Sequence, residues 1–468
     1  MKWSRCVPVA LCLLMLGCPR GPELAPGGLT AENFEPVALN GFGPEEQAAD
    51  HNDYPWSMEY FEPDGAKGAG HVYVGTWNRV QQWKGFQDHE PVYPEIRRYR
   101  PDISPTTWES VLDTRDLDLS DQDRPHGFRV MKVYRNQSDG RSMLYAGGRG
   151  DTVTLWRSET GDPGTWERFW MLEREGSIRG MAIHNGLLYM AFYNDYALLS
   201  GDGEPGALIL ATDGADVWTV SDDGFGNRFN VGIFTIASFN GWLYAGTHNQ
   251  LQGCEVWKLE GPDLEQAPER IIAHGGPRWL NEGAITMHVY DGHLYVGTVV
   301  NHILRMIGGL KPCDLLRIDT EDHWETVAGP CSIGGERSGF GERGNSYVWS
   351  MCEHDGWFYV GTYDMVTGLT YMLTHPDYIL SMMGVDLKSD DADAKCLTLI
   401  DLAVMQPNSG GDLYKSQDGV HWYCVSVDGL GDHNNYGLRT IKSVNGRLFI
   451  GMSNPYDGLE VWASPTAP

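Results

Sequence analysis

Hydrophobic and polar positions alternate along this chain in short segments that recur seven times. Each segment has a polar or glycine-containing break, an apolar–aromatic–apolar centre and then a small residue. The seven segments are HVYVGT (His71–Thr76), MLYAGG (Met143–Gly148), LLYMAF (Leu187–Phe192), WLYAGT (Trp242–Thr247), HLYVGT (His293–Thr298), FYVGT (Phe358–Thr362) and RLFIGM (Arg447–Met452). Most follow an Asn-Gly or Asp-Gly dipeptide, which accepts the positive φ of a two-residue hairpin turn. Each segment is therefore predicted to be the second strand of an antiparallel pair.

A further pair of strands follows in most repeats. The third strand has the pattern of residues 255–258, Glu-Val-Trp-Lys, and the fourth carries a tryptophan: Trp108, Trp166, Trp218, Trp324 and Trp422. Four short strands in each of seven tandem repeats are typical of a β-propeller. The sequence therefore predicts an all-β fold, a seven-bladed β-propeller.

The last repeat supplies only three strands before the chain stops at Pro468. Residues 33–39 resemble the fourth strand of the third repeat, and we expect them to complete the last blade and to close the ring. The propeller is thus predicted to span residues 33–468. Residues 364–410 interrupt the sixth blade, where they form either a lid or contact surface or an excursion without function.

The N-terminus has the composition of a targeting segment. Lys2 and Arg5 precede an apolar run that is too short to span a bilayer. Residues 1–17 are therefore predicted to be a signal peptide. The sequence Leu-Met-Leu-Gly-Cys that ends at Cys18 resembles the bacterial lipobox, which implies lipidation of Cys18 and a tether over residues 18–32. The alternative is an ordinary cleaved signal with an incidental Cys18.

The net charge and the cysteine spacing limit which ligands, cofactors and disulfides the chain can have. The formal net charge of −28 argues against nucleic acid, because its phosphates would be repelled. No CxxC spacing or cofactor motif is present, and the acidic run from Asp116 to Asp123 is better explained as a solvated loop than as a calcium site, so we expect no metal and no cofactor. Cys313 and Cys331 lie symmetrically about a predicted hairpin, and an exported protein can form disulfides. We therefore expect a Cys313–Cys331 bridge, with free buried thiols as the alternative.

Residues 413–422, Leu-Tyr-Lys-Ser-Gln-Asp-Gly-Val-His-Trp, resemble the Asp-box hairpin of sialidases and related propellers. In that superfamily the box is structural and lies on the face away from the ligand. The whole chain is similar to a group of exported bacterial β-propeller lipoproteins with degenerate boxes of this kind. This resemblance implies a fold and a compartment, the bacterial cell envelope on the periplasmic or surface side of the outer membrane. It implies no activity.

Candidate ligand-binding residues occur in the loops that share one face of the predicted propeller. Aromatic rings and guanidinium or imidazole donors suit sugars or peptides. The candidates are Trp77, Arg149, His248, His302, Arg343 and His433. Recurrent asparagines, including Asn230, Asn281, Asn345 and Asn435, are better explained by turn chemistry. Arg129, Arg179 and Arg439 fall on predicted first strands, but no sialidase-type FRIP segment accompanies them.

These observations predict a non-catalytic envelope lipoprotein, held at the membrane by its lipid anchor, whose propeller face binds a glycan or protein partner. The alternative is a propeller-type glycoside hydrolase or lyase acting on an extracellular polysaccharide. Two carboxylates that face each other about 5–10 Å apart in the mouth would favour the enzyme. A mouth of amides, aromatics and arginines would favour binding.

Overall fold

The computed structural model describes residues 27–43, 52–78, 93–194, 206–261, 267–300, 310–367 and 409–466. These residues form one 28-stranded, antiparallel assembly and a few short 3₁₀ helices, so the expectation of an all-β fold is confirmed. The predicted signal peptide, Cys18, His302 and most of the insertion 364–410 lie outside the described residues. None of the helices in the described ranges has the length and apolar character needed to cross a membrane.

The strands follow one another in groups of four, which we call units 1 to 7. The first strands of the units are β2 (Tyr54–Phe61), β6 (Gly127–Arg135), β10 (Gly176–His184), β14 (Gly232–Phe239), β18 (Gly283–Tyr290), β22 (Asn345–His354) and β26 (Gly437–Val444). The second strands, which contain the repeated motif, are β3 (His71–Trp77), β7 (Ser142–Gly150), β11 (Leu187–Tyr193), β15 (Trp242–His248), β19 (His293–Val299), β23 (Trp357–Asp364) and β27 (Arg447–Ser453).

The outer strands are shorter. The third strands are β4 (Glu95–Tyr99), β8 (Val153–Ser158), β12 (Leu208–Thr212), β16 (Val256–Leu259), β20 (Leu315–Ile318), β24 (Leu413–Ser416) and β28 (Glu460–Ala463). The fourth strands are β5 (Trp108–Asp113), β9 (Glu167–Leu172), β13 (Val217–Ser221), β17 (Glu269–Ile272), β21 (Trp324–Ala328), β25 (Tyr423–Ser426) and, in unit 7, β1 (Glu35–Ala38).

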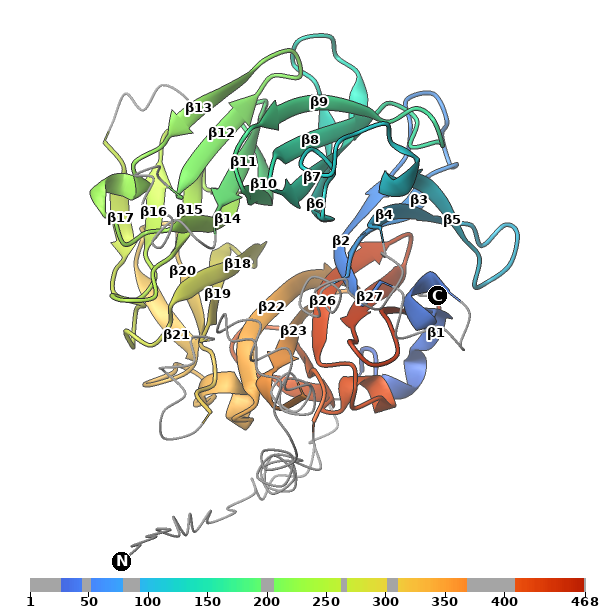
Figure 1. Ribbon diagram of the computed structural model, residues 1–468. Coiled ribbons are helices and arrows are strands. Elements are labelled where there is room, and N and C mark those ends of the chain that lie inside the picture. The colour runs from blue at the N-terminus through green and yellow to red at the C-terminus, as the bar shows by residue number, and fades with distance from the viewer. Residues whose placement is uncertain are drawn as a thin grey trace, which may run out of the picture.

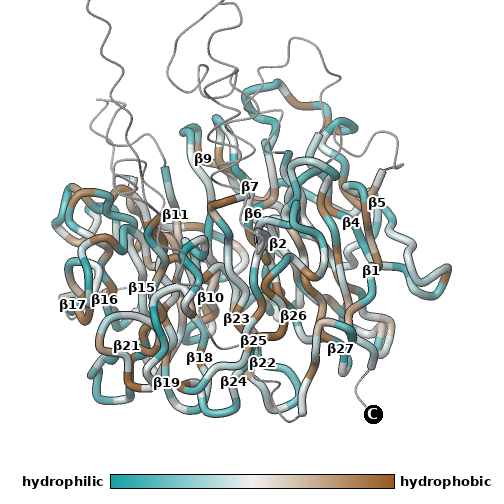
Figure 2. The backbone as a smooth tube through the Cα atoms, turned by 90° about the horizontal axis from the view of Figure 1, so that it is seen from below, coloured by the Kyte–Doolittle hydropathy of each residue, from teal (hydrophilic) through white to brown (hydrophobic). Residues whose placement is uncertain are grey.

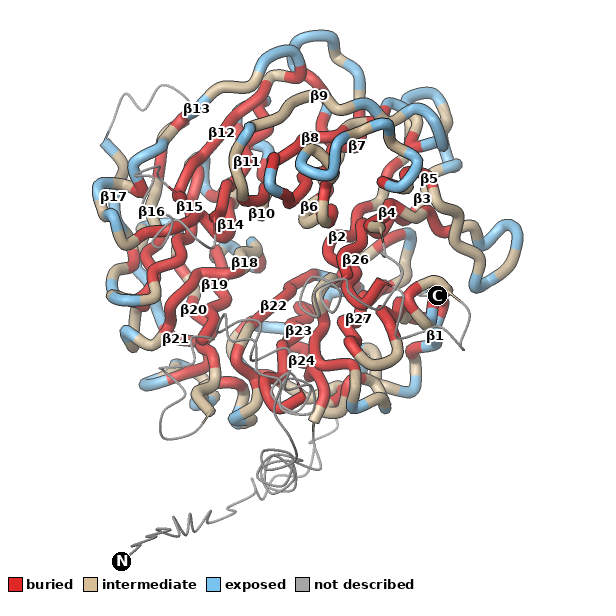
Figure 3. The backbone as a smooth tube through the Cα atoms, in the orientation of Figure 1, coloured by how far each residue is buried: buried red, intermediate tan, exposed pale blue. Residues whose placement is uncertain are grey.

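The units lie side by side around a common centre, and the first strands are innermost (Figure 1). Each first strand contacts the first strand of the next unit, and this series of contacts returns from β26 to β2. Seen from the side, the molecule is a thick disc whose strands run between two faces of connecting loops (Figure 2). Burial is greatest on the second strands, and exposed residues gather in the peripheral turns (Figure 3).

The N-terminal strand lies where the sequence predicts it. β1 pairs antiparallel with β28, and Glu35 lies opposite Ala463. Val37 of β1 is buried, and its carbonyl oxygen accepts a hydrogen bond of 2.9 Å from the Trp108 indole of unit 1. The strand therefore connects the C-terminal unit to the first unit through both its backbone and its core face.

The small residue of the repeated motif is explained by packing between units. A Cβ added at Gly297 of unit 5 would lie 2.7 Å from the Val348 side chain of unit 6. A Cβ added at Gly451 of unit 7 would lie 2.9 Å from the Pro55 side chain of unit 1. Unit 7 therefore packs on unit 1 as unit 5 packs on unit 6. In the described part of the chain, β27 and β2 share no ladder pair. Units 7 and 1 are connected there by a backbone hydrogen bond of 3.0 Å from the Asn454 N–H to the Asp53 carbonyl oxygen.

The expected Cys313–Cys331 disulfide is absent. Both thiols are free, with Cys313 buried before β20 and Cys331 exposed beyond β21. The hairpin pairing ends at Leu315 and Ala328. The chain then turns at Gly329 (φ +150°), and Cys331 lies in a turn with φ +56°. The prediction was wrong because the hairpin does not continue as a straight ladder out to the two cysteines.

The resemblance to an Asp-box falls on a tight turn between β24 and β25. The Ser416 hydroxyl accepts a hydrogen bond from the Gly419 backbone N–H, at 2.9 Å. The Asp418 carboxylate accepts from the N–H groups of Val420 and His421, each at 2.8 Å. Trp422 is buried in the core between units 5 and 6. These residues therefore stabilise the turn and pack the sheet.

Candidate functional site

All seven first strands carry a β-bulge at the same place. In unit 1 the ladder partners step from Pro55–Thr76 to Ser57–Gly75, so Trp56 has no partner opposite it. A bulge leaves its extra residue out of the ladder and turns that side chain in a new direction. Because the first strands are innermost, the seven skipped residues meet around the centre of the disc.

We call these seven residues the bulge ring. They combine four apolar side chains with three arginines. In order around the disc they are Trp56, Arg129, Arg179, Phe234, Ile285, Trp349 and Arg439. The four apolar members are buried, whereas the three arginines are half-buried and so remain partly accessible to solvent. The accessible chemistry of the ring is therefore that of guanidinium groups framed by aromatic rings.

Two arginines lie against aromatic rings of neighbouring units. The Arg129 guanidinium lies 4.9 Å from the centroid of Trp56 and donates a hydrogen bond of 2.7 Å to the Ser177 hydroxyl. The Arg179 guanidinium lies 3.9 Å from the centroid of Phe234. Cation–π contacts of this kind hold the guanidinium planes in place.

Arg439 has the least compensated environment. Its guanidinium lies 5.4 Å from the Trp349 ring centroid, and its Nε is buried without a hydrogen-bond partner. The described residues contain no acidic group in an ion pair with it. Removal from water, with a further contribution from the positive charge of Arg179, lowers the pKa of Arg439 to about 9. Arg439 and Arg179 belong to units 7 and 3, on opposite sides of the disc, so their charges face each other across its centre.

A second tier of charged residues lies three residues further along the same strands. It contains Glu59, Lys132, His288 and Lys442. Lys442 forms an ion pair with Glu59. Burial, with a further contribution from the positive charges of Lys442 and Lys132, lowers the pKa of His288 to about 4. This tier therefore has more cationic than anionic groups, like the bulge ring.

Three of the sequence candidates lie beside the bulge ring. Trp77 stacks on Trp56 with ring centroids 4.2 Å apart, and the Arg149 guanidinium lies 5.7 Å from the Trp77 ring. His248 stacks on Phe234 at 4.3 Å. Trp77 and His248 are only 8% and 5% exposed, so both contribute mainly to the packing around the ring. Their role in ligand binding stays a prediction.

The other candidates are not brought into the ring. Arg343 and His433 are exposed in the connections between units. The His433 Nδ1 lies 2.7 Å from the carbonyl oxygen of Ser409, at the edge of the insertion. The two ends of that insertion are tied together, because the Asp364 carboxylate accepts a 3.0 Å hydrogen bond from the Gly410 backbone N–H.

The recurrent asparagines are structural, as expected. The Asn345 amide donates hydrogen bonds to the carbonyl oxygen of Gly339, at 3.0 Å, and to the buried Asp412 carboxylate, at 2.7 Å. The same pair of bonds recurs at Asn230, Asn281 and Asn435. These asparagines fix the turn between one unit and the next, so they are not available for a ligand.

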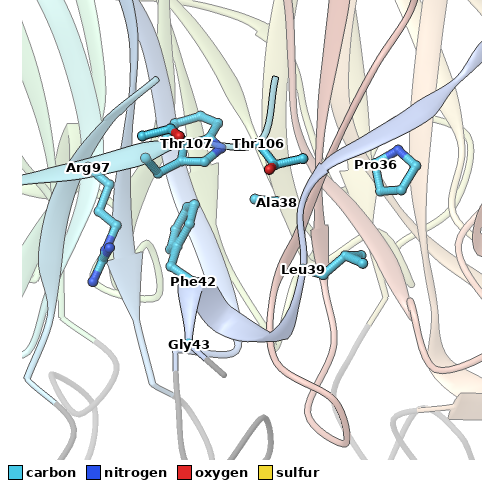
Figure 4. Close-up of a pocket in the computed structure, with 9 residues that line it drawn as sticks. Pro36, Ala38, Leu39, Phe42, Gly43, Arg97, Thr106 and Thr107 are labelled. Atoms are coloured by element: carbon cyan, nitrogen blue, oxygen red, sulfur yellow. The ribbon is translucent and has the colours of Figure 1, made fainter. Parts of the chain in front are cut away.

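A groove lies at the outer seam between unit 7 and unit 1. Figure 4 shows Phe42 and Arg97 on one side of it and Leu39 and Pro36 on the other. Arg97 is paired with Glu95 at 2.9 Å, and its guanidinium lies 5.3 Å from the Phe42 ring. The charge of Arg97 is thus already paired, which makes the bulge ring the stronger candidate site. Among the described residues, no cluster of three or more His, Cys, Asp or Glu side chains is placed to hold a metal ion.

Sequence reasoning missed four members of the bulge ring: Trp56, Phe234, Ile285 and Trp349. A sequence signal for them exists, because each bulge residue stands two positions before a methionine or isoleucine of its first strand. Aligning the seven repeats on that residue places the three arginines and the four apolar residues in one column.

No family model matches the chain, and no curated protein matches it. Solved structures give remote similarity. A mutant puromycin hydrolase complexed with PGG matches at 13% identity and a TM-score of 0.43, over 84% of this chain and 50% of that one. An ancestral GH74 enzyme matches at 11% identity and a TM-score of 0.49, over 89% and 49%. A prolyl endopeptidase structure matches at 10% identity and a TM-score of 0.39, over 90% and 52%. The chain thus spans about half the length of these proteins, and TM-scores below 0.5 do not indicate a shared fold.

Proposed function

We propose that this chain is a seven-bladed β-propeller of the bacterial cell envelope, anchored by lipid on Cys18, that binds a glycan or protein ligand without catalysis. The seven units correspond to the seven blades, and β1 completes the last one. The pairing of β1 with β28 and the packing of Pro55 on Gly451 support this closure. The anchor and the resemblance to Asp-box lipoproteins rest on the sequence.

The bulge ring is the observation that supports ligand binding at the centre of the disc. Buried rings such as Trp349 lie against the half-buried arginines and hold their guanidinium groups in fixed positions. Apolar surface combined with a few placed polar groups is the usual composition of a binding site for a small molecule or a sugar. Arginine and aromatic residues are also enriched where proteins bind other proteins.

A binding screen tests the proposal. The full chain, purified in detergent, is applied to a glycan array and used as bait against envelope proteins, in parallel with Arg129→Gln. Arg317→Gln is the matched control, because Arg317 lies on the outer strand β20 and is paired with Glu325 at 2.9 Å. We expect binding that Arg129→Gln weakens and Arg317→Gln leaves unchanged. The proposal would be overturned if Arg129→Gln bound the ligand as tightly as the wild type, or if neither screen gave binding.

A propeller-type glycoside hydrolase or lyase is the alternative function. It calls for two carboxylates that face each other at the site. Glu59, in the second tier, is paired with Lys442. Incubation of each array hit with the protein, followed by mass spectrometry of the products, separates the two functions. Unchanged glycans support binding, whereas cleaved glycans establish the enzyme.

A further inference from the structure

We propose that residues 27–29 hold one face of the disc toward the membrane that carries the lipid on Cys18, so that the bulge ring opens on the side away from this membrane. This inference rests on the proposed function, and it deepens that function by naming the side from which a ligand arrives. Three observations support it: a site on unit 6 that holds residues 27–29, the face on which this site lies, and the short stretch of chain between the site and Cys18.

The first observation is the site on unit 6, formed by Trp357, Tyr359 and Lys415, which we call the N-terminal seat. The buried Lys415 ammonium donates hydrogen bonds to the carbonyl oxygens of Gly27, at 2.7 Å, and of Leu29, at 2.8 Å. The Tyr359 hydroxyl accepts a hydrogen bond of 3.2 Å from the Leu29 N–H. The same ammonium lies 4.9 Å from the centroid of the Trp357 ring. The seat therefore holds the backbone of the N-terminal segment through three hydrogen bonds.

The corresponding site in unit 4 holds a hairpin turn. The lysine at the same ladder position is Lys258, which lies 4.5 Å from the centroid of the Trp242 ring. Lys258 and the Tyr244 hydroxyl both donate to the Asp322 carboxylate, in the turn between the third and fourth strands of unit 5. Unit 7 has no such turn, because its third strand is the C-terminal β28 and its fourth strand is the N-terminal β1. Residues 27–29 thus take the place of the turn that unit 7 lacks.

The second observation is the face on which the seat lies. Because the strands are antiparallel, the turn between the first and second strands and the turn between the third and fourth strands lie on one face, which we call the turn face (Figure 2). Two such turns meet where the Asn240 amide of unit 4 donates a 3.0 Å hydrogen bond to the Thr320 carbonyl oxygen of unit 5. The bulges lie toward the other ends of the first strands, as at the Pro55–Thr76 pair near the start of β2. The bulge ring therefore lies nearer the opposite face.

The third observation is the length of the free tether. Residues 18–26 connect Cys18 to the first residue held in the seat. An extended chain spans at most about 3.5 Å per residue, so this stretch reaches about 30 Å. A lipid on Cys18 would hold the turn face within this distance of the bilayer. The bulge ring would then open away from the membrane, toward partners in the surrounding medium.

Energy transfer from the protein to the bilayer tests this orientation. The full lipidated chain is placed in phosphatidylcholine vesicles that contain a rhodamine-labelled lipid as acceptor. A donor dye is attached at Glu321→Cys, on the turn face, or at Leu251→Cys, in the loop between β15 and β16 on the opposite face. Both positions are exposed, with 79% of the Glu321 side chain and 60% of Leu251 accessible. The background carries Cys331→Ser and Cys396→Ser and, without an added cysteine, serves as the labelling blank.

We expect the donor at position 321 to lose more of its fluorescence to the lipid acceptor than the donor at position 251. The inference would be overturned by equal loss at the two positions or by the reverse order. This comparison uses the N-terminal seat in its wild-type form, so it decides the orientation even if a variant of the seat fails to fold.

Lys415→Met tests whether the N-terminal seat sets the orientation. Loss of the ammonium should release residues 27–29, seen as faster hydrogen–deuterium exchange in that peptide, and should reduce the difference in energy transfer between the two donor positions. Lys258→Met is the matched control, because Lys258 holds a turn in the same way and does not contact the N-terminal segment. This control should keep the wild-type difference. A wild-type difference in Lys415→Met, with residues 27–29 released, would refute the role of the seat.

Mass spectrometry of the N-terminal peptide separates this inference from the proposed function. Absence of lipid on Cys18 would overturn the anchor and the inference together. A lipidated, vesicle-bound chain with the reverse order of energy transfer would overturn the inference alone. In both cases, binding that Arg129→Gln weakens in the earlier screen would still support a ligand site at the bulge ring.

Discussion

The Arg439 guanidinium lies 5.4 Å from the centroid of the Trp349 ring, and this contact is its principal compensation within the described residues. A cation–π contact contributes about 2 kcal/mol at a desolvated site, less than the several kcal/mol that desolvation of the charge costs. The molecule therefore keeps a charge that does not stabilise its fold.

Replacement of Arg439 by methionine should consequently stabilise the protein. Methionine has similar length and no charge, and its thioether packs well against aromatic rings. We expect the free energy of unfolding in an anion-free buffer to rise by about 1–3 kcal/mol, measured by urea denaturation. A decrease of the same size would mean that Arg439 stabilises the fold and would argue against a binding role.

Trp77 provides a contrasting case, because the sequence identifies it as a ligand contact and the structure packs it against Trp56 at 4.2 Å. Trp77→Ala should lower the free energy of unfolding by about 3–5 kcal/mol, since it removes a buried indole. Trp279→Ala, at a position that is 58% exposed, is the control and should change stability by about 0.5 kcal/mol or less. Equal stability of the two variants would show that Trp77 is not part of the core.

His288 predicts a pH dependence. Burial lowers its pKa to about 4 in the folded protein, below the usual value near 6.5. Between these two pH values the unfolded chain binds a proton that the folded chain does not, so the stability falls as the pH falls from 6.5 to 4.

His288→Phe should preserve the stacking on Phe358, whose centroid lies 5.4 Å from the imidazole, and remove this titration. We expect the stability of the variant relative to wild type to increase by about 2–3 kcal/mol between pH 7 and pH 4, measured by urea denaturation. His323→Gln, at an exposed position, should follow the wild type. Parallel curves for wild type and His288→Phe would contradict the prediction.

The closing strand can be tested through Val37. Its side chain is 4% exposed in the core of unit 7, so Val37→Asp would bury a carboxylate beside apolar residues. We expect a loss of about 3 kcal/mol and association of the exposed β28 edges, measured by thermal unfolding and gel filtration. Glu35→Lys, on the exposed face of the same strand, should remain monomer-like and stable. Wild-type behaviour of Val37→Asp would show that β1 is dispensable.

The sequence predicted the strands well because their signals are local. The alternating pattern and the Asn-Gly turns determine a hairpin by themselves, and the motif glycines report close packing between units, as at Gly451 and Pro55. The bulge ring was not predicted, because a bulge depends on the register between two strands. The disulfide prediction failed for a similar reason. The spacing of Cys313 and Cys331 predicted the hairpin between them, but it contained no information on the turn at Gly329.

Hydrogen–deuterium exchange of the full chain, with and without a saturating amount of a glycan or protein found in the binding screen, tests most directly whether the ligand binds at the bulge ring. We predict slower exchange in peptides that cover β10 and β26, the strands of Arg179 and Arg439. Protection confined to residues 36–43 and 106–108, which line the groove between units 7 and 1, would contradict the account.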